Sequence, residues 1–229
     1  MSRFLDGIRA VAFDAVGTLL FPNPGATVVY AEVAARHGLA ADTADIGPKL
    51  WAHFHIEDEK DRAAGWATSE QREQDRWRNI VFAALPGATE TLFQELFLHF
   101  SHQSAWTVPP DAAEVLAELH RCGFLLGMAS NYDSRLTTVM DGTPALAPVR
   151  ERLVISSLIG VRKPGLAFFA NGVLPAMGVP AGEILFVGDD HENDYLGATA
   201  AGMRAVLLDP KGKHPDVSER VAELRGLLV

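Results

Sequence analysis

The sequence has a single cysteine and no long apolar run. One cysteine excludes an internal disulfide, as is usual for a chain that stays in a reducing cytoplasm. Cys122 itself follows a helical pattern, and we expect it to be a buried thiol. No apolar stretch is long enough to cross a bilayer, and the first ten residues lack the apolar core of a signal peptide. These features predict a soluble, cytoplasmic protein.

Positive charge is also scarce. The chain has 20 lysines and arginines against 29 aspartates and glutamates, a net charge of −9, and no dense basic cluster. This argues against a surface for nucleic acid or for an anionic membrane. An acidic protein that binds an anionic substrate needs local positive charge, from a lysine or from a metal ion.

Short apolar runs that alternate with helical patterns are the main structural signal present. The pattern over 111–123, with Asp111 as its N-cap and Gly123 just past its end, is typical of an amphipathic helix, and 193–202 is a second helix. Strand–helix alternation predicts an α/β fold with a doubly wound, Rossmann-like parallel sheet. The predicted strands are 10–13, 125–129, 153–160, 184–188 and 205–208.

A long helical segment interrupts this alternation. Breaker residues cluster at 21–25 and again at 107–110, and the patterns between them are helical. We therefore predict a core domain of residues 1–21 and 107–229 and a helical insert of residues 22–106. The charged run at 57–62 is interpreted as solvated. The tryptophans in or near the insert are expected to pack inside it: Trp51, Trp66, Trp77 and Trp106.

Four of the five predicted strands end in residues that chemistry can use. In an open α/β sheet, ligands bind beyond the carboxyl ends of the strands, so these side chains should converge. The set combines a carboxylate, a hydroxyl, a lysine and an acidic cluster. Its members are Asp14 after the first run, Ser130 and Asn131 after the second, Arg162 and Lys163 after the third, and Asp189 and Asp190 after the fourth.

Each of these residues alone has an ordinary structural reading, as a turn former, a helix cap or a surface charge. Arg162, for example, is interpreted as an exposed arginine. Together they point further, because the carboxylates of Asp14, Asp189 and Asp194 would repel one another unless a cation neutralised them. Carboxylate oxygens suit Mg²⁺. With Lys163 to attract an anion, the set suits phosphoryl transfer through an aspartyl-phosphate on Asp14.

Four segments in a fixed order carry a resemblance to a known family. The sequence resembles the haloacid dehalogenase superfamily of hydrolases, subfamily I, with a helical cap of the C1 type inserted after the first strand. The resemblance implies that Asp14 is the nucleophile, that Thr18 supports the first motif, and that the insert closes over the site and selects the substrate. The segments are FDAVGTL (13–19), ASNYDSR (129–135), VRKPGLAFF (161–169) and VGDDHENDYLGATAAGM (187–203).

The same resemblance assigns the remaining site residues. Ser130, in the Ser-Asn pair of the second motif with Asn131, and Lys163 would hold the transferring group. Mg²⁺ would be held by a set made up of Asp14, the backbone carbonyl of Val16, Asp189, and either Asp194 or Asp190.

Val16 departs from the family's phosphatase pattern. Phosphatases of the family usually carry a second aspartate two residues after the nucleophile, which protonates the leaving group and then activates water. Valine can do neither, and general acid–base help is worth about 10²–10⁴-fold in rate, or roughly 3–5 kcal/mol of barrier. We expect a slow phosphatase, a substrate with a good leaving group, or another proton donor. His53 and His55 are candidates for that donor, although a helix-surface role is the simpler reading.

Three functions remain open. The preferred one is Mg²⁺-dependent hydrolysis of a small phosphorylated metabolite. The first alternative is metal-independent 2-haloacid dehalogenation, which also proceeds without the missing aspartate, but the acidic cluster and Phe169, at a position where those enzymes tend to carry tyrosine, argue against it. The second alternative is a catalytically weak protein that binds Mg²⁺ and phosphate and acts through a protein partner.

Overall fold

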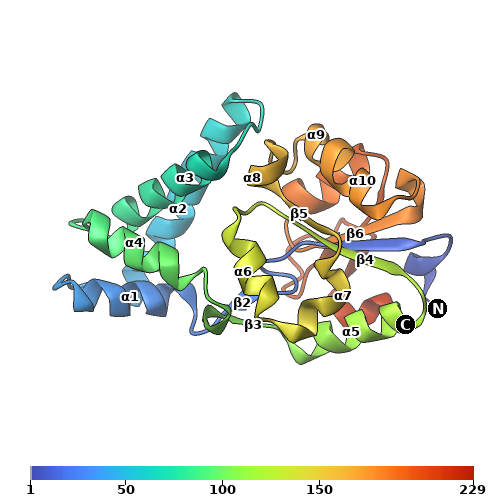
Figure 1. Cartoon of the computed structure of the whole chain (residues 1–229), viewed down its shortest axis with the longest axis horizontal. Helices are drawn as coiled ribbons and strands as arrows, with labels where there is room; N and C mark the ends of the chain where they lie inside the picture. Colours follow the sequence, from blue (N-terminus) through green and yellow to red (C-terminus); the bar gives the residue numbers. More distant parts are fainter. Residues whose placement is uncertain (1) are drawn as a thin grey trace.

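The computed structural model describes residues 2–229, which fold around a six-stranded parallel sheet (Figure 1). The strand order is β5-β4-β1-β6-β7-β8. The chain runs outward from β1 through β4 to β5, returns to the other side of β1 at β6, and then runs outward again. This reversal of direction confirms the predicted doubly wound α/β fold. The strands are β1 (Ala10–Phe13), β4 (Leu125–Ser130), β5 (Leu153–Ile155), β6 (Ile184–Gly188), β7 (Arg204–Leu208) and β8 (Arg220–Val221).

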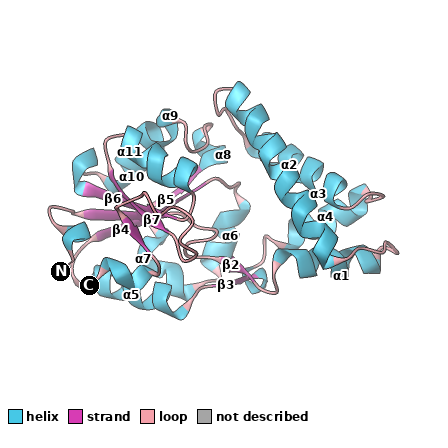
Figure 2. Cartoon of the chain, turned by 180° about the vertical axis from the view of Figure 1, so that it is seen from behind, coloured by secondary structure: helices cyan, strands magenta, loops and turns pink. Residues whose placement is uncertain are grey.

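Helices cover both faces of the sheet, so the central strands are buried on both sides (Figure 2). In β1, Val11 and Phe13 face one hydrophobic cluster, whereas Ala10 and Ala12 face the other. This alternation explains why the strand reads as a continuous apolar run. The helices on the first face are α5 (Pro110–Arg121), α6 (Arg135–Asp141) and α7 (Ala147–Arg150). Those on the second are α9 (Leu166–Phe168), α10 (Leu174–Met177) and α11 (Gly197–Ala200).

Two of the predicted element boundaries are wrong. The run 153–160 forms a strand only over β5, and the rest is the short helix α8 (Ser156–Ile159). The reason is tertiary, because the Ser156 hydroxyl exchanges hydrogen bonds with the backbone of Tyr132 and turns the chain. Asp111 is not the N-cap of α5 but lies in its first turn, since Pro110 occupies the first helical position, where no N–H is needed.

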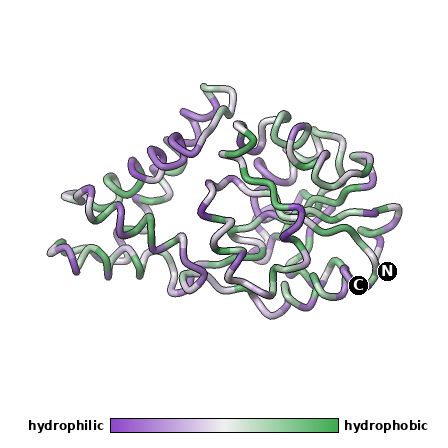
Figure 3. Tube along the Cα trace, viewed as in Figure 1, coloured by the Kyte–Doolittle hydropathy of each residue, from purple (hydrophilic) through white to green (hydrophobic). Residues whose placement is uncertain are grey.

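Two predictions about burial are also wrong. Cys122 is exposed, because it is the C-cap of the helix over 110–121, where the neighbouring residues Arg121 and Gly123 are exposed as well. The charged run at 57–62 is only partly solvated, since Glu57 and Asp61 are 2% and 1% exposed. Both carboxylates are ion-paired with Arg72 of the neighbouring helix. In Figure 3, the helices that carry these residues, α2 (Thr43–Ala63) and α3 (Glu70–Ala84), are more hydrophilic than the strands of the core.

Four helices lie between two very short strands that pair with each other. The strands β2 (Phe21–Pro22) and β3 (Trp106–Thr107) form an antiparallel ribbon where the predicted insert of 22–106 begins and ends. The helices pack around their own hydrophobic cluster, to one side of the core (Figure 1). They are α1 (Ala26–Arg36), α2 (Thr43–Ala63), α3 (Glu70–Ala84) and α4 (Glu90–His99). Among the described residues, no helix combines the length and apolarity needed to span a membrane.

Candidate active site

The site lies between β1 and β6, where the chain reverses the direction in which it adds strands to the sheet. Asp14 directly follows β1, and its backbone N–H donates to the carbonyl of Val187 in β6 at 2.8 Å. Asp189 directly follows β6, so the two carboxylates come from adjacent strands. Ser130, the last residue of β4, lies at the same edge of the sheet on the other side of β1. The predicted convergence of strand ends therefore occurs.

Lys163 occupies the centre of the site and is almost fully buried. Its Nζ donates to Asp14 Oδ1 at 2.6 Å, to Asp194 Oδ1 at 2.7 Å and to the carbonyl of Ala129 at 3.0 Å. All three ammonium hydrogens are therefore used. Asn131 makes two hydrogen bonds with the backbone of Lys163. Its side-chain oxygen accepts from the Lys163 N–H at 2.7 Å, and its side-chain amide donates to the Lys163 carbonyl. Asn131 thus positions the lysine backbone.

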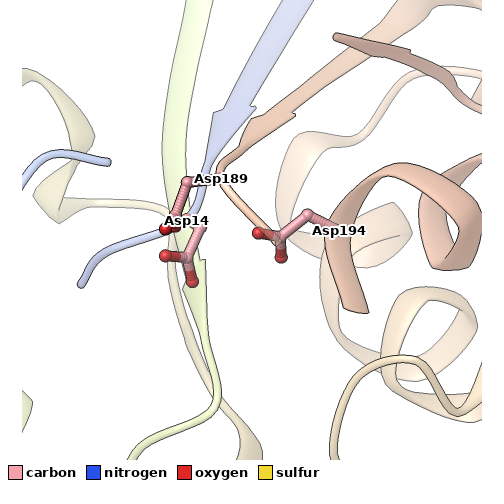
Figure 4. Close-up of side chains that lie close together, drawn as sticks. All are labelled: Asp14, Asp189 and Asp194. Atoms are coloured by element: carbon pink, nitrogen blue, oxygen red, sulfur yellow. The ribbon is translucent and has the colours of Figure 1, made fainter. Parts of the chain in front are cut away.

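Three carboxylates gather around this lysine. One oxygen from each of Asp14, Asp189 and Asp194 lies within 4.8 Å of the others. Figure 4 shows Asp194 pointing toward the other two from the opposite side. The close approach depends on glycine, because a Cβ on Gly17 would collide with the Asp189 carboxylate, and one on Gly188 would collide with that of Asp194. Gly17 also has φ of +100°, which L side chains rarely adopt.

The charges of the cluster perturb one another. Burial raises the pKa of Asp14 above its usual range despite the nearby lysine, and burial likewise raises the pKa of Asp194 to about 7. Asp189 faces solvent, yet partial desolvation and then the charge of Asp194 raise its pKa to about 6. Burial alone would lower the pKa of Lys163, but the charges of Asp14 and Asp194 outweigh it and raise the pKa. The site holds more negative charge than one lysine balances.

This donor set fits a hard divalent cation. Three carboxylate oxygens surround one point and carry surplus negative charge, which is the ligand chemistry that Mg²⁺ prefers. Asp190, the alternative ligand in the sequence, has a different environment. Its carboxylate accepts from the backbone N–H groups of Glu192 and Asn193 at 2.9 Å each and caps the helical turn η6 (His191–Leu196). The Asp14–Asp189–Asp194 cluster does not include Asp190.

Thr18 and Val16 lie on the turn after Asp14. Thr18 is buried, and its hydroxyl donates to Asp189 Oδ1 at 3.3 Å, so it links the turn after Asp14 to the carboxylate cluster. Val16 is 38% exposed and lines a cavity together with Gly17 and Asp189. The position where the resemblance implies an acid in phosphatases thus presents hydrocarbon to the cavity.

The prediction that Arg162 is an exposed arginine is wrong. Arg162 is 6% exposed and donates to both carboxylate oxygens of Glu73 at 2.6 and 2.7 Å. Glu73 belongs to α3 of the insert, so this buried ion pair joins the insert to the core. Glu70, one turn earlier, accepts from the backbone N–H and hydroxyl of Ser134 and from Ser157. These long-range partners left no signal in the local sequence.

The sequence analysis did not predict that aromatic residues of the insert line a cavity. A cavity of about 450 Å³ lies between the insert and the carboxylate cluster. Trp51, Trp77 and Trp106 line it rather than only packing inside the insert, and Trp51 is 67% exposed. The clustering of aromatics in the insert was the available signal. His53 and His55, the candidate proton donors, are not among the lining residues.

The fold and the site define a class of hydrolase, and comparison with known proteins identifies it. The model of the haloacid dehalogenase-like hydrolases matches residues 8–202, and the chain belongs to this family. This confirms the resemblance carried by the four motifs.

Individual relatives and solved structures are similar to the chain over different shares of their length. The chain is similar to haloacid dehalogenase-like hydrolase domain-containing protein 3 of Xenopus laevis, at 32% identity over 53% of this chain and 49% of that protein, about half its length. It is 31% identical to a phosphoglycolate phosphatase of Yersinia pestis over 88% of this chain and 81% of that protein. The fold matches an L-2-haloacid dehalogenase structure with a TM-score of 0.76, at 20% identity over 96% and 97% of the two chains.

Proposed function

We propose that the protein is a Mg²⁺-dependent phosphatase that acts on a small phosphorylated molecule through an aspartyl-phosphate on Asp14. The observation that carries the proposal is the cluster of Asp14, Asp189 and Asp194, in which Lys163 pairs with Asp14 and Asp194 and leaves Asp189 without a cationic partner among the described residues. An acidic site of this kind would repel a phosphate dianion without a metal.

Each residue then has a role. Asp14, at the end of β1, presents its carboxylate as the nucleophile, and Lys163 holds that carboxylate in place. Ser130, at the end of β4, would donate its hydroxyl to a phosphoryl oxygen. Mg²⁺ would be held by Asp14, Asp189, Asp194 and the backbone carbonyl of Val16, and when bound it neutralises charge on the phosphoryl oxygens. The helical insert of 22–106 acts as the cap that shields the reaction from water and selects the substrate.

The test measures phosphate release from acetyl phosphate and phenyl phosphate, with excess Mg²⁺ or with a chelator. We expect metal-dependent release that Asp14→Asn abolishes and Asp189→Asn strongly reduces. Asp190→Asn is the matched control, since asparagine caps a helix as well as aspartate does and the residue lies outside the carboxylate cluster. Metal-independent release, or release that survives in Asp14→Asn, would contradict the proposal.

Dehalogenation is a second candidate that one observation favours. A halide leaves without a proton, so Val16 would be no handicap to it. The corresponding assay measures halide release from 2-chloropropionate in the presence of a chelator. Halide release without phosphate release would replace the phosphatase proposal, whereas binding of Mg²⁺ and phosphate without either reaction would favour a role through a protein partner.

A further inference from the structure

The cavity beside the carboxylate cluster is apolar and aromatic. Phe54 packs edge-on against Trp77 with ring centroids 5.2 Å apart, and Phe100 packs against Trp106 at 5.7 Å. These rings come from α2, α3, the end of α4 and β3, so the insert supplies most of the wall. At about 450 Å³, the cavity is of the size that holds small molecules. The walls suit a flat hydrocarbon group.

The cavity also lacks a free charge away from the carboxylate cluster. Its charged lining residues are Asp189, which belongs to the cluster, and Arg135. Arg135 is already engaged, because it donates to both Asp133 oxygens at 2.7 Å each and to the carbonyl of Phe97 at 2.8 Å. A substrate carboxylate or ammonium placed there would lose hydration without gaining a partner. The group held in the cavity is therefore uncharged.

Val16 lies between the apolar cavity and the carboxylate cluster. Its side chain lies at the junction of the cavity and the site, where it lines the wall beside Asp189. It adds apolar surface and supplies no proton. A phosphate ester can react without a general acid when its leaving group is already a weak base. A phenolic hydroxyl has a pKa of about 10, whereas an aliphatic hydroxyl is close to water, about 16.

We propose that the substrate is a phosphomonoester of an uncharged aromatic hydroxyl compound, whose ring occupies this cavity; the inference rests on the proposed phosphatase function. Asp14 attacks phosphorus, the ester P–O bond breaks, and its electron pair leaves on the aryl oxide, which takes a proton from solvent. Water then attacks the phosphorus of the aspartyl-phosphate. The Asp14 carboxylate is released with dihydrogen phosphate, which keeps both protons of the water. No step needs an acid at Val16.

The substrate panel separates apolarity from leaving-group strength. Phenyl and cyclohexyl phosphate have similar size and apolarity but differ in the pKa of the leaving hydroxyl. Cyclohexyl phosphate and glycerol 3-phosphate both release an aliphatic alcohol but differ in polarity. We expect kcat to favour phenyl over cyclohexyl phosphate by at least about 10²-fold, and kcat/KM to favour cyclohexyl over glycerol phosphate by about tenfold or more.

Two variants test whether the leaving-group effect depends on Val16 and whether the preference for apolar groups depends on the cavity. Val16→Asp should raise kcat for cyclohexyl phosphate by about 10²–10⁴-fold and raise it far less for phenyl phosphate. Thr27→Phe, on α1, fills the cavity from a half-buried lining position. It should lower the ratio of kcat/KM for phenyl phosphate to that for acetyl phosphate by about tenfold. Val28→Phe is the matched control on the next residue, which is exposed and does not line the cavity.

The outcomes are distinguishable. Release from acetyl phosphate with no preference for phenyl over cyclohexyl phosphate, or for cyclohexyl over glycerol phosphate, overturns this inference and leaves the phosphatase proposal standing. The inference is also overturned if Thr27→Phe and Val28→Phe change the phenyl-to-acetyl ratio equally. Absence of release from every substrate overturns the phosphatase proposal and this inference with it.

Discussion

The ion pair between Arg162 and Glu73 joins the insert to the core and provides the sharpest test of the structure. The two side chains are 7% and 2% exposed and share two hydrogen bonds of 2.6 and 2.7 Å. Arg162→Met keeps the length and apolar volume of the stem but removes the charge. The Glu73 carboxylate would then stay buried with one remaining partner, the Thr68 hydroxyl at 2.7 Å.

The expected cost follows from that burial. Removing one partner of a buried ion pair costs about 3–5 kcal/mol, because the other charge is left uncompensated. The hydroxyl of Thr68 offsets part of this, so we expect Arg162→Met to lower the free energy of unfolding by about 3 kcal/mol. The double variant with Glu73→Gln should be more stable than Arg162→Met alone, since it buries no unpaired charge. The resulting coupling energy should be about 2 kcal/mol or more.

Urea denaturation followed by circular dichroism measures these free energies. Arg78→Met is the control on the same helix, where the pair with Glu90 is about half exposed and worth about 0–1 kcal/mol. Hydrogen exchange should locate the loss in 64–76, the part of the insert that contacts the core at Arg162, before it reaches β1. A cost for Arg162→Met no larger than that for Arg78→Met would refute the reasoning.

Three further results are expected. Gly188→Ala pushes a methyl group into the Asp194 carboxylate and should cost about 1–3 kcal/mol with loss of turnover, whereas Gly182→Ala, in open space, should stay within about 0.5 kcal/mol in urea denaturation. Burial alone would raise the pKa of Glu70, but hydrogen bonds from serines outweigh it and lower the pKa below its usual 4.5. The stability that these contacts contribute is present above about pH 4.5 and is lost as pH falls through the lower folded-state pKa. Glu70→Gln should therefore flatten the acid side of a plot of Tm against pH. The pKa of Asp189 is raised to about 6, so ionisation of Asp189 destabilises the metal-free protein as pH rises from about 4 through 6. Excess Mg²⁺ should therefore raise Tm more at about pH 8 than at about pH 5. An equal rise in Tm at both pH values would contradict the metal site.

Much of the fold and the motif positions could be predicted because the signals are local. Buried parallel strands need apolar residues on both faces, so β1 and β6 stand out as short apolar runs followed by Asp14 and Asp189. The parallel arrangement then brings those ends together without further information. The insert could be predicted because prolines, with a glycine at the first end, interrupt the chain at 21–25 and at 107–110.

The arrangement within the site needed the tertiary structure. Asp189, Asp190 and Asp194 are equivalent as sequence, yet the turn after β6 directs Asp190 onto backbone N–H groups and Asp194 toward Lys163. Only the backbone path decides between such neighbours. The same holds for Arg162, whose local sequence is typical of an exposed loop.

The sequence by itself determined the α/β core, the order of its motifs and the place of Asp14, the proposed nucleophile, at the end of the first strand, because each depends on residues next to one another in the chain. The tertiary structure decided which charges are buried together and what faces the reaction. Glu73 and Arg162 meet across 89 residues, and the aromatic wall of the cavity is assembled from several elements of the insert. Such contacts depend on how helices pack, and packing is set by the whole chain at once.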